Sequence, residues 1–379
     1  MLVALAAAGW LMCACGSSGG AGDKFPPPQP PATPTISTAA AQNGAVIVTL
    51  ADATSGTTIY YSLDGSAPTN QSQIYEAPFL VAGSLTVKAM ADVPTTTLKS
   101  QVASQAFSLN IPSGTLVWSD EFTNSGSTNA QPNPSTWTYD MGTDCCGNHE
   151  WEDYCAWNSS VSPCNPSNPN AYEGTDGYLH IVARQTSPGL AAGNFTSGRL
   201  KSEGLFSFMY GRIEARMMLP ESQGMWPAFW MLGNSIATVN WPACGELDIM
   251  EHIDGSNPPP SVGAPAPGYD WIAGSVHGGT SSNEANGTQQ YHPAGFSAAA
   301  WHTYGMIWTK GQIEFYVDST TNVYATFTPA NFPGTWPFDQ GPEFILLNLA
   351  VGGDWPGAPN ASTPFPSEMQ VDYVRIYTY

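Results

Sequence analysis

The sequence predicts an all-β protein built from two β-sandwich domains. From residue 116 onward, short runs of alternating apolar and polar residues recur between Gly, Pro and Asn turns, and no long helical pattern interrupts them. A smaller set of such runs lies between residues 35 and 110. A length of 379 residues is also about two domains' worth of chain.

The first domain is predicted for residues 35–110, after a linker at residues 16–34. The linker begins with Gly and Ser and ends in a stiff polyproline-like stretch, FPPPQPPATP at residues 25–34. The predicted strands of this domain are separated by turns such as Asp64-Gly65, and a small β-sandwich is their natural packing. These strands are residues 45–50, 58–62, 84–89 and 102–109.

The first fifteen residues, MLVALAAAGWLMCAC, form an apolar stretch too short to span a bilayer, which indicates an export signal without the usual positive n-region. LMCAC at residues 11–15 resembles a bacterial lipobox, with Cys15 as the candidate lipidated residue and Cys13 as the weaker one. We expect an exported protein held at the bacterial cell surface or outer membrane as a lipoprotein, with simple secretion as the alternative.

The charge balance excludes several classes of partner. Thirty acidic residues against ten basic ones give a net charge of −20. This charge repels nucleic acid, anionic membranes and sulfated polysaccharides, and it favours a neutral polymer as ligand. We expect the protein to be a monomer. The thirteen tryptophans offer faces on which sugar rings stack, although most are expected in the core.

Five cysteines lie in the body of the chain. Cys145, Cys146, Cys155 and Cys164 crowd into a polar loop, which in an exported protein predicts two disulfides. Because adjacent cysteines seldom bond each other, Cys145 and Cys146 are each expected to reach one of the other two, in either order. A zinc site is less favoured, since no Cys-x-x-Cys spacing is present. Cys244 is interpreted as a small buried hydrophobic residue.

Three carboxylates, Glu246, Asp248 and Glu251, stand within six residues of an otherwise apolar strand. On a regular strand Glu246 and Asp248 share one face, and Glu251 has the wrong parity. A β-bulge at Met250 would return Glu251 to the face of the other two acids. Paired carboxyl groups across a sugar ring are the machinery of glycoside hydrolysis, which the spacing therefore predicts.

The segment GELDIME at residues 245–251 resembles the active-site strand of glycoside hydrolase family 16, in the bulged form of its laminarinases, the endo-β-1,3-glucanases. The resemblance covers residues 115–379 and implies a jelly-roll catalytic domain, two stacked antiparallel sheets with a cleft on the concave face. Further matching stretches follow in the family's order: LVWSDEF at 116–122, YGRIEAR at 210–216, MWPAFWML at 225–232, WHTY at 301–304, FYVD at 315–318, LNLAVGG at 347–353 and VDYVRIY at 371–377.

The first domain carries a second resemblance. TTIYYSLDGSAPT at residues 57–69 and LTVKAMA at residues 85–91 resemble the immunoglobulin-like module at the C-terminus of chitobiases and β-hexosaminidases. Such modules usually act as spacers. Tyr60, Tyr61 and Tyr75 are the alternative, as sugar-binding residues, although paired tyrosines on a strand more often serve packing.

The family resemblance implies a role for each acid. Glu246 is similar to the nucleophile, Glu251 to the general acid/base, and Asp248 to the residue that orients and tunes both. A retaining mechanism needs carboxyl groups about 5 Å apart, with Glu246 ionised and Glu251 protonated. The implied activity is endo-hydrolysis of β-1,3 bonds in a laminarin-type glucan. Alternatives are mixed-linkage glucan, agar or carrageenan as substrate, a transglycosylase, or a glucan-binding protein without catalysis.

Strand parity suggests further substrate-binding residues. Arg212, Glu214 and Arg216 share one face of their strand, which we expect to be the cleft floor. Trp226 and Trp230 also share a face near the acids, and Trp230 is the favoured sugar platform, with core packing as the alternative for both.

The resemblance adds three more residues. His277 lies where laminarinases carry a histidine close to the acid/base, and it would bind substrate or set a carboxylate's protonation. Asn148 and Glu150 in GNHEW, residues 147–151, are similar to a segment that binds the non-reducing side of the cleft. There His149 and Trp151 depart from the family pattern, which leaves the subsite preference on that side open.

No cofactor is needed for this chemistry. The family often holds one structural Ca²⁺ on its convex side. The matching positions are Glu121, the backbone of Gly177 and Asp372, whose hard oxygen atoms suit this ion.

Overall fold

The computed structural model describes residues 29–94, 97–143, 147–254, 270–280 and 282–379. The predicted export signal, Cys15, most of the linker, Cys145 and Cys146 lie outside the described residues. Within them the chain is almost entirely β-structure, so the all-β prediction is confirmed. The described helices are η1 (Gln42–Gly44) and α1 (Ile236–Val239), and neither approaches the length or apolarity of a membrane span.

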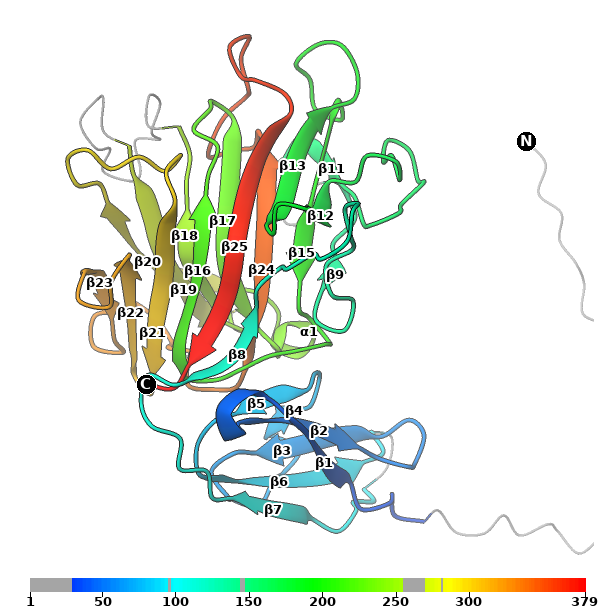
Figure 1. Ribbon diagram of the computed structural model, residues 1–379. Helices are drawn as coiled ribbons and strands as arrows, with labels where there is room; N and C mark the ends of the chain where they lie inside the picture. Colours follow the sequence, from blue (N-terminus) through cyan, green and yellow to red (C-terminus); the bar gives the residue numbers. More distant parts are fainter. Residues whose placement is uncertain (1–28, 95–96, 144–146, 255–269, 281) are drawn as a thin grey trace, which may run out of the picture.

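The small domain is a sandwich of two sheets (Figure 1). A three-stranded sheet has the order β1 (Thr35–Ala40), β2 (Val46–Ala51), β5 (Phe79–Val81). A four-stranded sheet has the order β4 (Gln73–Ile74), β3 (Thr58–Ser62), β6 (Leu85–Asp92), β7 (Ala103–Phe107). Alternate residues of these strands point inward, and Val48, Leu50, Tyr61 and Val87 form their shared core. Tyr61 is 3% exposed and stacks on Phe79, so packing explains this tyrosine.

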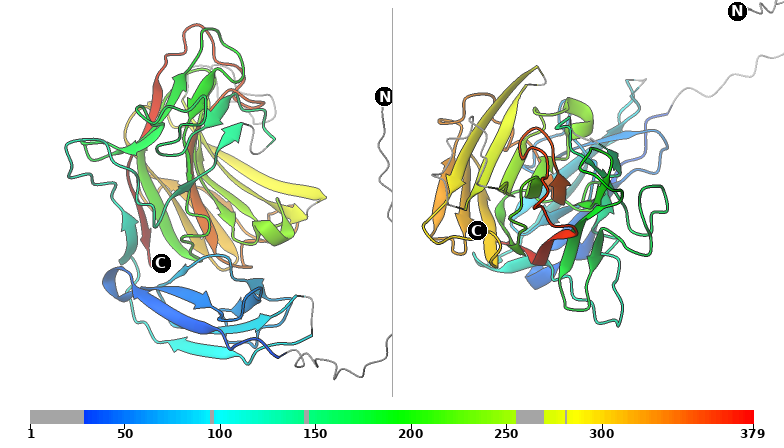
Figure 2. Two further views of the ribbon diagram at one scale, coloured as in Figure 1. Left: turned by 90° about the vertical axis from the view of Figure 1, so that its right-hand side faces the viewer. Right: turned by 90° about the horizontal axis from the view of Figure 1, so that it is seen from above.

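The large domain stacks an eleven-stranded sheet on a seven-stranded sheet, as the jelly-roll prediction requires (Figures 1 and 2). The main path of the larger sheet is β10 (Gly142–Thr143), β11 (Glu152–Tyr154), β14 (Phe195–Ser197), β13 (Leu179–Gln185), β25 (Ser367–Tyr377), β16 (Gly211–Met218), β21 (His302–Thr309), β22 (Gln312–Val317) and β23 (Val323–Phe327). Off this path, β12 (Ala171–Glu173) pairs with β13, and β8 (Leu116–Asp120) pairs with β25.

The smaller sheet of the large domain carries the candidate site. Its order is β20 (Asn283–Tyr291), β19 (Ile272–Thr280), β18 (Glu246–Glu251), β17 (Met225–Gly233), β24 (Glu343–Val351), β15 (Arg199–Lys201), β9 (Thr138–Tyr139). Phe229, Met231 and Leu347 of this sheet belong to one buried core with Ile213 and Met306 of the larger sheet. The side chains that alternate with them therefore lie on the outer face of the seven-stranded sheet.

The small domain is docked on the large one at the end near the C-terminus (Figure 1). The Leu80 amide donates to the carbonyl of Ser207 at 2.9 Å, and the Ser207 amide donates to the carbonyl of Pro78 at 3.0 Å. Asn43 Nδ2 donates to the Leu116 carbonyl at 2.7 Å. Leu80 is also buried in the core cluster of the large domain. These contacts join the two domains through backbone pairing and a shared apolar core.

Candidate active site

A β-bulge brings the three acids of β18 onto one face of the sheet. Asp248 pairs with Ser275 and Glu251 pairs with Ala273, so Ile249 and Met250 together oppose Gly274 of β19. This is the bulge that the parity of the acids predicts, and it returns Glu251 to the face of Glu246 and Asp248. A Cβ at position 274 would meet the hydroxyl oxygen of Tyr324 at 2.4 Å, which explains the glycine there.

The residues that alternate with the acids on β18 are apolar and buried. Leu247, Ile249 and Met250 point the other way into the core between the sheets and are at most 1% exposed. On the acids' own face, Asp248 pairs across β17 with Trp230, and Glu246 pairs with Leu232. A carboxylate in such surroundings loses much of its hydration, so its neighbours decide its charge state.

Two tryptophans each donate one hydrogen bond to one of the outer acids, which are Glu246 and Glu251 at the two ends of β18. Trp241 Nε1 donates to Glu246 Oε2 at 3.0 Å, and its ring is 43% exposed. Trp226 Nε1 donates to Glu251 Oε1 at 3.0 Å from a half-buried ring. Sequence parity identifies Trp226, but it misses Trp241, which lies in the loop before β18. Its sequence signal is a tryptophan five residues before the first acid.

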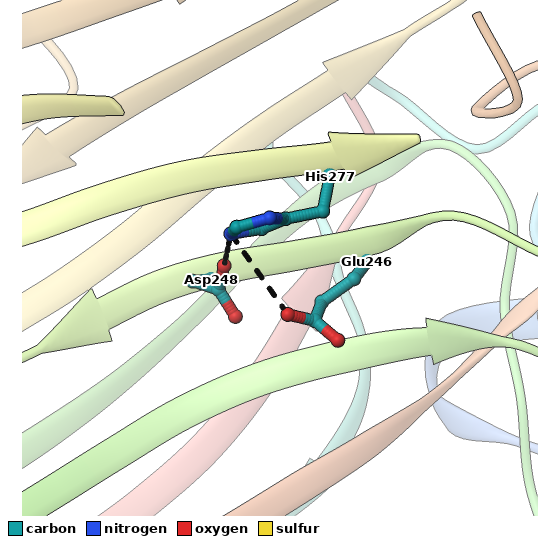
Figure 3. Close-up of side chains that lie close together, drawn as sticks. All are labelled: Glu246, Asp248 and His277. Carbon is teal, nitrogen blue, oxygen red and sulfur yellow. Dashed lines mark ion pairs between the residues drawn. The ribbon is translucent and has the colours of Figure 1, made fainter. Parts of the chain in front are cut away.

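His277 of β19 lies beside the acids (Figure 3). Its Nε2 is 3.2 Å from Asp248 Oδ2 and 3.9 Å from Glu246 Oε1, and its Nδ1 is 2.8 Å from Glu284 Oε1. The predicted proximity to the carboxylates therefore holds, but on β18 the ion-pair partners are Asp248 and Glu246 rather than Glu251, which the family resemblance implies as the acid/base.

Burial and mutual repulsion disfavour the charged forms of Glu246 and Glu251. Burial, followed by the charge of Asp248, raises the pKa of Glu246 to about 8, against the opposing effects of His277, the Trp241 hydrogen bond and Arg199. The same two causes raise the pKa of Glu251 well above its ordinary value. Each of the two carboxyl groups therefore holds a proton more readily than an isolated glutamate does, which is what a group that donates a proton requires. Burial opposes the ionised form of Glu246 that the family resemblance implies, whereas His277 and the Trp241 hydrogen bond favour it.

Trp230 lies on the site face but is 9% exposed. The guanidinium carbon of Arg199 is 4.6 Å from the centre of its ring. Its Nε1 donates to Asn348 Oδ1 at 2.8 Å. Trp230 is thus a buried part of the site floor, and the exposed ring of Trp241 is better placed to meet a sugar.

A chain of buried hydrogen bonds links this floor to the loop before β11. Asn348 Nδ2 donates to the Tyr154 hydroxyl at 3.2 Å, and that hydroxyl donates to Glu150 Oε2 at 2.8 Å. Asn148 Nδ2 lies 3.4 Å from Glu150 Oε1. Glu150 is 7% exposed, so the structure connects Asn148 and Glu150 to the site through Tyr154 and Asn348. No sequence pattern indicated Asn348 or Tyr154 in this role.

Arg212 and Arg216 are not on the cleft floor, contrary to the sequence prediction. They belong to β16 of the eleven-stranded sheet, whereas the acids belong to the seven-stranded sheet. Arg212 stacks on the ring of Tyr377 at 3.7 Å and pairs with Glu214. Arg216 pairs with Asp372 at 2.7 Å. Parity identified one shared face correctly but could not say to which sheet the strand belongs.

The predicted Ca²⁺ ligands do not fit that ion. Both carboxylate oxygens of Glu121 accept hydrogen bonds from Arg375, at 2.9 and 2.7 Å. Asp372 is paired with Arg216, and Gly177 lies in the turn between β12 and β13. Guanidinium groups thus already neutralise both carboxylates, and a second cation at the same oxygens would be repelled.

The disulfide pairing also differs from the prediction. Cys155 and Cys164 are bonded to each other, with a Cα–Cα distance of 5.7 Å. They are therefore not the partners of Cys145 and Cys146, which lie outside the described residues. Cys244 is free and 4% exposed, as its interpretation as a buried hydrophobic residue requires.

Several known proteins are similar to this chain in fold and in sequence. Residues 168–375 match the family model of the glycosyl hydrolases family 16, and residues 38–104 match that of the chitobiase/β-hexosaminidase C-terminal domain. A keratan-sulfate endo-1,4-β-galactosidase of Sphingobacterium multivorum is 35% identical over 270 residues, which are 69% of this chain and 54% of that protein.

Two further relatives are similar over the large domain. A β-glucanase of Rhodothermus marinus is 34% identical over 315 residues, 76% of this chain and 99% of that protein. The X-ray structure of an endo-β-1,3-glucanase from Pyrococcus furiosus covers 69% of this chain and 94% of its own, with a TM-score of 0.55 and 37% identity. This chain spans about half of the first relative and nearly all of the second. The family match, the stacked sheets and the bulged acidic strand together identify the chain as a member of glycoside hydrolase family 16.

Proposed function

We propose that this protein is a retaining endo-β-1,3-glucanase that cuts laminarin-type glucans. The observation that carries the proposal is the bulge in β18, which places Glu246, Asp248 and Glu251 on one face of the sheet. The endo-β-1,3-glucanase that resembles the chain supports the choice of linkage, and the β-glucanase supports a glucan as substrate.

The reaction proceeds by double displacement. A carboxylate oxygen of Glu246 attacks the anomeric carbon and forms an ester bond. The glycosidic C–O bond breaks at the same time, and its oxygen takes the proton of Glu251. In the second step Glu251 accepts a proton from water, the water oxygen attacks the anomeric carbon, and the ester bond breaks with its electron pair returning to Glu246. Only carboxyl groups of the chain take part in this bond making and breaking.

Asp248 and His277 support the nucleophile. Asp248 lies between the two glutamates along β18 and forms an ion pair with His277. The imidazolium lies 3.9 Å from Glu246 and favours its ionised form, which offsets part of the repulsion from Asp248. The pair therefore tunes the charge of Glu246 without entering the covalent steps.

The charges on the site face favour a neutral substrate. Arg199 and Lys201 of β15 share the face of Trp230, and both are paired with Asp140, at 2.9 and 2.6 Å. Lys201 is also paired with Glu203. A sulfate group would have to displace one of these acids to reach a cation. This arrangement argues against a sulfated polymer even though one relative is a keratan-sulfate hydrolase by name.

Aromatic rings flank the acids at both ends of β18. Trp241 stands at the Glu246 end and Trp226 at the Glu251 end, where Trp355 packs edge-on against it with ring centres 5.3 Å apart. Trp355 also lines an open hollow of about 410 Å³. We assign sugar rings to both ends, so a bound chain crosses the acids, as internal cleavage requires.

Product analysis on several polysaccharides tests the proposal. The purified protein is incubated separately with laminarin, mixed-linkage β-glucan, agarose and keratan sulfate, and the products are separated by chromatography. A ladder of short oligosaccharides from laminarin is expected. Cleavage of mixed-linkage glucan alone would change the linkage, and intact polymer in every tube would favour a glucan-binding protein. A Glu246→Ala variant that is folded and fully active would refute the mechanism.

We also propose that the protein is exported and held at the cell surface by a lipid on Cys15. The apolar residues 1–15 and the following linker support this. Mass spectrometry of the protein isolated from membranes checks it. A mature chain that begins at Cys15 and carries fatty acid is expected, and an unmodified cleaved chain in the medium would mean simple secretion.

A further inference from the structure

We propose that Glu284 is a positioning residue that holds the imidazolium of His277 against Asp248 and Glu246. Glu284 is not part of the acidic strand and comes from β20, two strands from the bond-breaking carboxylates along the sheet. The role deepens the proposed hydrolytic function and rests on it, but the contact itself is a property of the free protein.

The first step of the argument is the geometry of the imidazole. Its two ring nitrogens both face carboxylate oxygens, Nε2 towards Asp248 at 3.2 Å and Nδ1 towards Glu284 at 2.8 Å. A neutral imidazole has one nitrogen with a lone pair, and that lone pair would point at a negative oxygen. Both contacts are favourable only when both nitrogens carry a proton, so this arrangement selects the cation.

The second step is the register of the β19–β20 hairpin. His277 pairs directly with Asn286, so Asn286 and Glu284, two residues apart on β20, share the face of His277. Asn286 Nδ2 donates to Glu284 Oε1 at 3.0 Å and fixes the carboxylate that the histidine meets. The Glu284 side chain is 36% exposed, so water reaches it and its charge costs little.

The third step is the charge around the ring. Among the described residues, His277 is faced by Glu246 and Asp248 of β18, by Glu284 of β20, and by the ring of Trp241 at 6.2 Å. Its charge also acts on Glu251 of β18 and lowers the pKa of that carboxyl group. Burial disfavours the cation, but the hydrogen bonds and charges of these carboxylates raise the pKa of His277 well above its ordinary value. Asp248 and Glu246 are part of the reacting site, whereas Glu284 contacts His277 and Asn286.

The consequence for the reaction follows from the position of the cation. An imidazolium beside Glu246 favours the ionised nucleophile. Without Glu284, Nδ1 loses its acceptor, the ring gives up its proton at lower pH, and the stabilisation of Glu246 is lost over the same range. The effect is expected in kcat, because Glu284 contacts the histidine and not a reacting atom.

The test compares Glu284→Gln with Glu314→Gln, a matched change on β22 of the other sheet, where Glu314 accepts a hydrogen bond from Gln312. NMR titration of the six histidines is carried out on each full-length protein, with the His277 signal assigned from a His277→Gln spectrum. In Glu284→Gln the His277 pKa is expected to fall by about one unit, and in Glu314→Gln to stay at the wild-type value. Asn286→Ala should give a smaller fall in the same direction.

Kinetics then separate positioning from general stability. Glu284→Gln should lower kcat on laminarin about tenfold, leave KM within about twofold, and move the acid limb of the pH profile, which Glu246 sets, to higher pH. Its unfolding temperature should be like that of Glu314→Gln. A His277 signal that titrates identically in both folded variants would overturn the proposal. The titration needs no substrate, so this outcome remains distinct from a failure to cleave glucan.

Discussion

The indole hydrogen bonds to Glu246 and Glu251 are expected to act on different limbs of the pH profile. Trp241→Phe removes the donor 3.0 Å from Glu246 and keeps an aromatic ring. Trp226→Phe does the same at Glu251. In both cases a hydrogen bond to the ionised carboxylate is lost, so the pKa of that carboxyl group rises. The profile of kcat/KM reports these groups in the free enzyme.

The size of the shift follows from the strength and exposure of the bond. A hydrogen bond to a charged group contributes about 1.5–3 kcal/mol, which corresponds to roughly one to two pKa units. The Trp241 ring is 43% exposed, so water partly replaces the lost donor. We therefore expect a shift of about half a unit to one unit, or a three- to tenfold loss of kcat/KM on the acid side of the limb.

The two variants should move different limbs. Glu246 must be ionised to attack, so a higher pKa moves the acid limb of Trp241→Phe to higher pH. Glu251 must be protonated to act as an acid, so a higher pKa moves the alkaline limb of Trp226→Phe to higher pH and widens the profile. Rates on laminarin between about pH 4 and 10, bracketing the titration of carboxyl groups in such sites, measure both limbs. Profiles that superimpose on the wild type, or that move the same limb, would refute the assignment of the two acids.

Three further changes test other parts of the structure. Leu80→Ala, in the interface between the domains, should lower the free energy of unfolding by about 2 kcal/mol. Both domains should still unfold in one cooperative calorimetric transition. A separate transition of the large domain at its wild-type temperature would contradict the docking. Tyr154→Phe removes the hydroxyl group that accepts from Asn348 Nδ2 and donates to Glu150 Oε2, which should cost about 1–3 kcal/mol in urea unfolding. A stability equal to the wild type would argue against the hydrogen-bond chain. Addition of EDTA should leave the unfolding temperature unchanged because Arg375 and Arg216 already neutralise Glu121 and Asp372. A lower unfolding temperature in EDTA would support a Ca²⁺ site at these residues.

Local patterns predict much of this molecule. Alternation of apolar and polar residues indicates the all-β class, and the parity of Glu246, Asp248 and Glu251 alone predicts the bulge in their strand. These predictions hold because a strand displays its side chains with period two, so the information lies within a few residues.

The remaining features depend on contacts between distant segments. The parity of Arg212 and Arg216 is correct, but membership of a sheet is decided by strand order, which parity does not contain. Glu284 reaches His277 only through the register of the β19–β20 hairpin. Arg375 reaches Glu121 across 254 residues of sequence, so a cation of the chain already pairs with one of the carboxylates at the positions matched to the Ca²⁺ site. The Cys155–Cys164 bond likewise could not be predicted from the spacing, because several pairings fit it.

The initial anomer of the product tests the central claim most directly. The full-length protein is mixed with laminarin in an NMR tube, and the anomeric proton of the newly formed reducing end is followed before mutarotation equilibrates it. Double displacement through Glu246 and Glu251 predicts that the β-anomer appears first and the α-anomer grows in later. An α-anomer that appears first would mean a single displacement by water, and Glu246 would then not be the nucleophile.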